Sequence, residues 1–151
     1  MENKTSNEQR VVNFFLAQSD FKIKKCFQKT ESIVLNLFGK ASIEKLDKTQ
    51  KTILGSVFEQ RIRKAFNFRR GNLDCVVDSI DVDIKFSVKD SWMIPPECVG
   101  QICILASLDF KNKGNAFGVM NVKELYLCQG SNRDKKRTIS KKHYDKIKWI
   151  L

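Results

Sequence analysis

The first half of the chain carries apolar residues at the spacing of amphipathic helices. The pattern predicts three helices, within residues 9–18, 29–40 and 48–66. Gly39 is a suitable terminator for the second helix. The third has the clearest beginning, because Asp47 supplies a capping carboxylate and Gln50, three residues later, can reach back to it. The apolar stripe of the third helix consists of Leu54, Phe58, Ile62 and Ala65.

The second half of the chain reads mainly as β-strands. Apolar and β-branched runs predict strands near residues 73–77, 80–87, 101–109 and 115–122, a loop over 89–97, and a final helix near 140–149. Helices that surround a central cluster of strands indicate an α/β or α+β domain. The length of 151 residues suits a single domain, with an N-terminal helical part over 1–46 and the core over 47–151.

One predicted strand has an apolar face and a charged face. Alternation places Val82, Ile84 and Phe86 on the first face and Asp81, Asp83 and Lys85 on the second. An exposed side of a sheet is the ordinary explanation of such alternation. However, Asp74 lies on the preceding strand, and Glu59 lies at the edge of the apolar stripe of the third helix. Carboxylates from three successive elements therefore predict a common site.

Composition excludes several classes of protein. The chain is 42% apolar, but it has no apolar run of the roughly 18 residues that span a bilayer. The N-terminal "MENKTSNEQR" lacks the features of a secretory signal, so we expect a soluble cytoplasmic protein without membrane contact. The single histidine, His143, argues against sites that need several histidines, and we expect it to be a solvated helix residue. Free thiols are expected at the five cysteines, which are Cys26, Cys75, Cys98, Cys103 and Cys128.

Positive charge is concentrated near the C-terminal end. The chain has a net charge of +11, and residues 111–151 hold 11 Lys and Arg against 3 Asp and Glu, a net of +8. In "NRDKKRTISKK", cations alternate with hydroxyl donors, as in surfaces that bind phosphate backbones. A solvated loop explains the same composition.

The acidic residues also resemble a known pattern. Glu59 on a helix, then Asp74, then Asp83-Ile84-Lys85 on the next strand is similar to the metal site of the restriction-nuclease superfamily, whose signature is PD-(D/E)xK. More specific is the order that follows: "SWMIPPE" at 91–97, Gly100, an apolar strand, a Gly-containing strand, and "GSNRDKKRTIS" before a terminal "IKWI". Over about residues 48–151 the chain resembles the catalytic domain of the NaeI-type restriction endonucleases.

This resemblance implies a fold, an activity and partners. The fold would be a restriction-endonuclease-like core, a central mixed sheet flanked by helices, in a single endonuclease domain. The activity would be Mg²⁺-dependent cleavage of double-stranded DNA by a type II enzyme of bacteria or archaea. A homodimer acting on a palindromic site and a cognate DNA methyltransferase are implied as partners. The founding enzyme has a second, C-terminal DNA-binding domain, whereas this chain ends where the catalytic domain would, so effector-DNA activation is not expected.

The site residues follow from the same positions. Glu59, Asp74 and Asp83 would be the catalytic carboxylates and Lys85 the catalytic lysine. Magnesium prefers oxygen ligands and typically takes one or two carboxylates. We therefore expect Asp74, Asp83 and the Ile84 carbonyl as direct ligands, with Glu59 binding through water or holding a second ion. Asp81, an extra carboxylate on this face, has no assigned role.

DNA contacts are expected mainly from the basic segment. The candidates are Arg133, Lys135, Lys136, Arg137, Thr138, Lys89 and Trp92. For Trp92, packing with the rigid Pro95-Pro96 pair as a wall beside the active strand is favoured over direct DNA contact. Two other functions stay open: a nicking or repair nuclease of the same fold, and a non-catalytic DNA-binding module. The presence of Glu59, Asp74, Asp83 and Lys85 together argues against the module.

Overall fold

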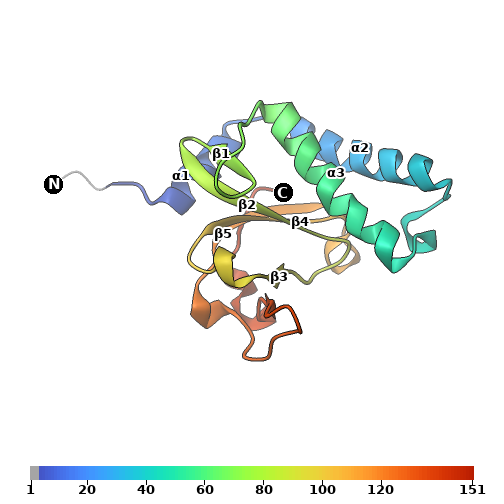
Figure 1. The fold of residues 1–151 in the computed structure, drawn as a ribbon. Coiled ribbons are helices and arrows are strands. Elements are labelled where there is room, and N and C mark those ends of the chain that lie inside the picture. Colours follow the sequence, from blue (N-terminus) through green and yellow to red (C-terminus); the bar gives the residue numbers. More distant parts are fainter. Residues whose placement is uncertain (1–3) are drawn as a thin grey trace.

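The computed structural model describes residues 4–151, in which three helices cover one face of a mixed β-sheet (Figure 1). The helices are α1 (Asn7–Leu16), α2 (Asp20–Phe38) and α3 (Lys48–Phe66). The sheet contains, in spatial order, β1 (Cys75–Val77), β2 (Ile80–Ser87), β4 (Ile102–Ser107), β5 (Ala116–Asn121) and β7 (Lys148–Trp149). The β2 and β4 strands are parallel, and the other neighbouring pairs are antiparallel. The expected α/β class, with a central mixed sheet and flanking helices, is confirmed.

The helix ends follow local sequence rules. The Asp47 carboxylate accepts a hydrogen bond from the Gln50 backbone N–H (2.8 Å), and the Gln50 side chain accepts one from the Asp47 N–H (3.0 Å), which completes the predicted capping box of α3. Gly39 ends α2 in the left-handed region at φ 62°. The α2 helix begins at Asp20, well before the predicted residue 29. Its buried stripe extends over this lysine-rich first half, where charged neighbours obscured the apolar period.

The two faces of the sheet pack against different layers. Residues paired across neighbouring strands direct their side chains to the same face. Ile84 pairs with Ile104 on the face covered by α1, α2 and α3, and both residues belong to the larger core. Asp83 pairs with Cys103, and Lys85 with Leu105, on the opposite face. That face is covered by a smaller core that includes Trp92, Ile94, Ile139 and Tyr144.

The C-terminal segment differs from the prediction. The expected helix near 140–149 is wrong: Lys141–Lys146 forms a 3₁₀ segment, and β7 then joins the sheet beside β5. Gly118 of β5 allows this approach, since a Cβ there would lie 2.6 Å from Ile147 Cγ2 and 2.8 Å from Trp149 Cε3. The close contact of β5 with the chain near β7, about thirty residues later, therefore favours a strand over a helix at the C-terminal end.

The expected loop over 89–97 also contains a short strand. Within it, β3 (Met93–Ile94) pairs antiparallel with β6 (Arg137–Thr138) and forms a second, two-stranded sheet. This pairing places the basic segment on the side of the main sheet that lies away from α2 and α3 (Figure 1). No helix within residues 4–151 combines the length and apolarity needed to cross a membrane.

Candidate active site

The charged face of β2 carries two of the predicted site residues. Asp83 is 6% exposed, an unusual degree of burial for a carboxylate. The Lys85 Nζ lies 2.9 Å from Asp83 Oδ2. Burial alone lowers the pKa of Lys85, but the neighbouring Asp83 carboxylate outweighs it, so the pKa lies above its ordinary value. The lysine is therefore a cation held against a buried anion.

Asp74 joins this pair from the edge strand. It immediately precedes β1, and the β1–β2 register places it next to Asp83. Its Oδ2 accepts a hydrogen bond from the Ile84 backbone N–H at 2.8 Å. Burial raises the pKa of Asp74 to about 7; the Ile84 N–H opposes the rise, whereas Asp83 and Glu59 add to it. The Asp74 and Asp83 carboxylates thus lie close enough at one sheet edge for the charge of Asp83 to raise the pKa of Asp74.

Glu59 influences these carboxylates electrostatically from the helical side of the sheet. It lies on α3, over the face of the sheet opposite to Asp83, and its carboxylate pairs with Arg63 at 3.7 Å. Its charge nevertheless contributes to the raised pKa values of Asp74 and Cys75. The structure therefore brings Asp74, Asp83 and Lys85 into a direct network, while Glu59 is an electrostatic neighbour. Arg63 was missed from the sequence, although its position four residues after Glu59 was a visible signal.

The donor set suits a hard divalent cation. Asp83 Oδ2 is buried, and among residues 4–151 its charged partner is the Lys85 ammonium at 2.9 Å. A buried carboxylate is costly without a counter-charge, and a divalent cation would offset that cost in place of the Lys85 ammonium. Over the same residues, no three His, Cys, Asp or Glu side chains are grouped as a ready metal site. Magnesium needs only one or two carboxylates when water and a substrate phosphate complete its shell, so Asp74 and Asp83 fit.

Asp81, which had no role from the sequence, holds the loop before β1. Its Oδ1 accepts hydrogen bonds from the backbone N–H groups of Asn72 (2.9 Å) and Leu73 (3.5 Å). The loop approaches so closely that a Cβ on Gly71 would lie 2.0 Å from Asp81 Oδ1. Leu73 is followed directly by Asp74. Asp81 is therefore a positioning residue for the segment that delivers Asp74.

The basic segment forms an ordered loop. Asn132 Oδ1 accepts hydrogen bonds from the backbone N–H groups of Asp134 (3.0 Å) and Lys136 (2.9 Å). Arg133, Lys135 and Lys136 are exposed. Their side chains make no ion pair with residues 4–151. These three cations are available to phosphates.

The other expected DNA contacts are more constrained. Arg137 donates to the Cys128 carbonyl (2.7 Å) and pairs with Glu124. Thr138 lies in β6, and its hydroxyl contacts the Met93 sulfur at 3.5 Å. Lys89 is more than half exposed and pairs with Asp109 at 2.8 Å.

Trp92 requires a correction. It is 1% exposed, and its indole N–H donates to the Ala106 carbonyl at 3.0 Å. The place of Trp92 among the expected DNA contacts is wrong, because a ring buried in the smaller core offers no surface to DNA, and the favoured role in packing accounts for its position.

The environment of two buried cysteines makes them poor nucleophiles, and His143 differs from its expected setting. All five thiols are free, as expected, and four of them are buried. Burial raises the pKa of Cys75 to about 12 and that of Cys26 to about 11, so both stay protonated at neutral pH. The expectation of a solvated helical His143 is wrong in part. The residue is half-buried in the 3₁₀ segment, and its ring centroid lies 5.2 Å from that of Tyr126.

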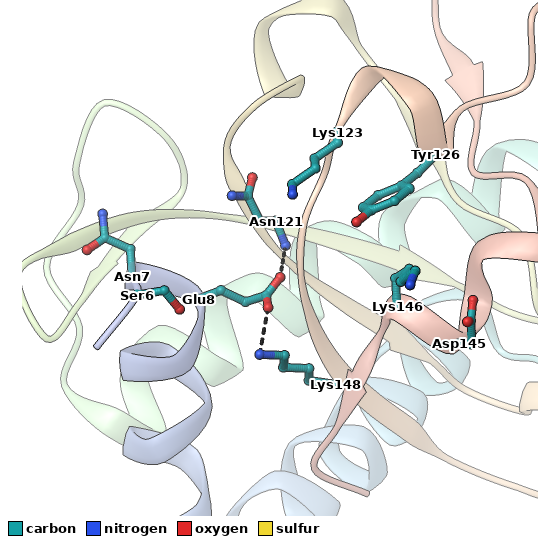
Figure 2. A pocket seen from close by; sticks show the side chains of 9 residues that line it. All are labelled: Ser6, Asn7, Glu8, Asn121, Lys123, Tyr126, Asp145, Lys146 and Lys148. Carbon is teal, nitrogen blue, oxygen red and sulfur yellow. Dashed lines mark hydrogen bonds and ion pairs between the residues drawn. The ribbon is translucent and has the colours of Figure 1, made fainter. Parts of the chain in front are cut away.

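A cavity of about 550 Å³ lies at another place, between the beginning of α1 and the ends of β5 and β7 (Figure 2). The Glu8 carboxylate there accepts a hydrogen bond from the Asn121 backbone N–H (2.6 Å) and pairs with the Lys148 ammonium (2.9 Å). Figure 2 shows these groups pointing toward one another. None of the acidic network of β1 and β2 lines this cavity. We interpret it as the junction that fastens α1 to the sheet.

Comparisons with known proteins identify the family of this chain. The sequence model of the family described as "Restriction endonuclease NaeI" matches residues 22–151. A curated relative, "Type II restriction enzyme NaeI" of Lentzea aerocolonigenes, is 32% identical over 104 residues. That alignment covers 68% of this chain and 32% of the relative, so the chain spans about a third of the relative it matches.

Proposed function

Because the chain belongs to the restriction endonuclease NaeI family, we propose that it hydrolyses phosphodiester bonds of double-stranded DNA at specific sites with Mg²⁺ as cofactor. The observation that carries this proposal is the network of Asp74, Asp83 and Lys85 at one sheet edge. Two adjacent carboxylates, one of them with a raised pKa, form a site that gains from a divalent cation.

The metal would be held by the edge of β2. Asp74 and Asp83 would supply carboxylate oxygens, and the Ile84 carbonyl a third. In a β-strand the N–H and C=O of one residue point to the same side. Since the Ile84 N–H points to Asp74, its carbonyl faces the same edge. A bound magnesium ion would supply a more acidic water and stabilise charge on the scissile phosphate.

Each protein group then has a defined task. Asp83, fixed on a central strand, sets the position of the cation. Asp74, fixed by the Ile84 N–H through one oxygen, keeps the other free to bind. Lys85 would leave its ion pair with Asp83 when the cation enters, and would orient the attacking water and bind the scissile phosphate. Glu59 would act through water from the helical side.

DNA would be held on the face that carries Asp83 and Lys85. The exposed cations Arg133, Lys135 and Lys136 lie in a loop anchored by β6, on that side of the sheet. They would neutralise phosphates and give binding a strong salt dependence. Arg137, Thr138 and Lys89 are secondary candidates, because each already has a protein partner.

Symmetry follows from the reaction. One active site faces one strand, so cutting both strands of a palindrome favours a two-fold dimer. We propose a homodimer that acts in the cytoplasm of a bacterium or archaeon beside a DNA methyltransferase that protects the host.

The experiment that tests this proposal is digestion of plasmid and genomic DNA by the purified protein, with Mg²⁺ and with EDTA. Discrete fragments that require Mg²⁺ are expected. Nicked circles alone would favour a nicking or repair nuclease. Intact DNA under both conditions, despite tight binding, would contradict the proposal and favour a non-catalytic module.

A further inference from the structure

A second concentration of positive charge lies in a groove between α2 and α3, on the helical side of the sheet. The groove has a volume of about 430 Å³. Five of the residues that line it are cations: Lys22, Lys25, Lys29, Arg61 and Lys64. None of them forms an ion pair with a carboxylate of residues 4–151. The groove is therefore basic, and no carboxylate of the described residues neutralises its cations by an ion pair.

One of these cations, Arg61, has a buried N–H group without a hydrogen-bond acceptor among the described residues. The Arg61 Nε is buried, and within the described part of the chain no atom accepts a hydrogen bond from it. Buried polar groups are normally paired, so the Arg61 guanidinium, which no protein acceptor holds at Nε among the described residues, can turn toward a phosphate in the groove.

The spacing of the lysines favours a chain of phosphates over a single ion. Lys22, Lys25 and Lys29 lie on one face of α2, and the first and last are separated by about 10 Å along the helix axis at roughly 1.5 Å per residue. In duplex DNA one strand advances about 3.4 Å per phosphate along the axis, and an extended single strand advances further, so this distance accommodates at least two successive phosphates. Arg61 and Lys64 line the opposite wall, from α3.

An aromatic ring distinguishes single strands from duplexes. Phe21 lines the groove and is 65% exposed, and the Lys25 ammonium lies 5.7 Å from its ring centroid. Aromatic rings beside basic grooves stack the unpaired bases of single strands. In a duplex the bases face each other, so Phe21 would stay uncovered. A second copy of this chain is a poor occupant, because a two-fold contact would place five cations against five.

We propose that the α2–α3 groove binds single-stranded nucleic acid, with the cations on its phosphates and Phe21 stacked on a base. The α2 and α3 helices, which form the groove, lie on one side of the sheet (Figure 1). Asp83 and Lys85 face the other side, so this site is separate from the pair that they form. The inference goes beyond the proposed nuclease function and does not depend on it.

The test is fluorescence anisotropy with a labelled oligothymidylate and, in parallel, a duplex of the same length, in EDTA so that nothing is cleaved. Lys25→Glu with Lys29→Glu is expected to weaken oligothymidylate binding about tenfold or more. Phe21→Ala is expected to weaken it about 5- to 150-fold, the range for loss of one stacked base. The matched control is Lys40→Glu with Lys113→Glu, which changes the net charge equally at exposed positions outside the groove.

The outcomes separate the alternatives. A loss confined to the groove variants and to the single strand, with unchanged melting temperatures, supports the proposal. An equal loss in the control variant would overturn it in favour of general electrostatic attraction. An unaffected Phe21→Ala variant, or an equal loss of duplex binding, would overturn the assignment to single strands. Plasmid cleavage measured on the same variants reports separately on the active site, so failure of the nuclease proposal would be seen independently.

Discussion

The most informative single change is Asp74→Asn. An asparagine has nearly the same shape, and its side-chain oxygen can still accept the hydrogen bond from the Ile84 N–H. The substitution removes the negative charge of Asp74, which burial and the neighbouring Asp83 and Glu59 make unfavourable. We expect the variant to be more stable than the wild type without metal and to be inactive. A stabilising change that abolishes activity is characteristic of a strained functional site.

The magnitude follows from the pKa of Asp74. A rise from 3.8 to about 7 corresponds to at most about 4 kcal/mol. Because the carboxyl is only partly buried, solvent screening reduces this to about 1–2 kcal/mol. The sign is fixed by linkage: a raised pKa in the folded state means that stability falls as the pH rises from about 4 to 7. The advantage of Asp74→Asn should therefore be largest above pH 7 and shrink toward pH 4.

The assay is thermal unfolding in EDTA and in Mg²⁺ at several pH values. For a domain of this size, the expected gain at pH 8 in EDTA is about 3–6 °C. Mg²⁺ should stabilise the wild type above pH 7 and have little effect on the variant. A variant that is less stable than the wild type at pH 8, or that responds to Mg²⁺ as the wild type does, would refute the assigned role of Asp74.

Three further predictions address the neighbouring groups. Lys85→Ala should reduce cleavage about 10²- to 10⁴-fold in a gel assay while DNA binding changes little, and Lys85→Arg should not rescue it; rescue would mean that charge alone suffices. Asp81→Ala should lower stability by about 1–3 kcal/mol in urea unfolding, and combining it with Gly71→Ala should cost less than the sum of the two; strict additivity would show that the close approach is unimportant. Lys135→Ala with Lys136→Ala should lower the slope of log binding constant against log salt for duplex DNA by about 2; an unchanged slope would assign these lysines to a solvated loop.

Local signals in the sequence were sufficient for much of the fold. The capping pair Asp47 and Gln50 placed the beginning of α3, and alternation along β2 put Asp83 and Lys85 on one face. Both depend on neighbours a few residues apart. The pairing of β7 with β5 depends on the absence of a Cβ at Gly118, a contact between distant segments that no local pattern encodes.

The candidate site shows the same division. The sequence pattern predicted Asp74, Asp83 and Lys85 as site residues. The hydrogen bond from the Ile84 N–H to Asp74 and the loop held by Asp81 arise only when β1 and β2 pair. Glu59 was expected beside the other carboxylates, yet α3 packs on the opposite face of the sheet, so it acts on Asp74 through its charge. The burial of Trp92 likewise depends on the smaller core that forms after folding.

The central claim is that Asp83 belongs to a magnesium-dependent centre that cuts DNA. The most direct measurement is the rate of plasmid cleavage in Mg²⁺ by the wild type and by Asp83→Ala, with Asp145→Ala as the control for loss of an exposed carboxylate. We predict that Asp83→Ala still binds DNA but does not cut it, while the control variant cuts like the wild type. Cleavage by Asp83→Ala at the wild-type rate would contradict the account.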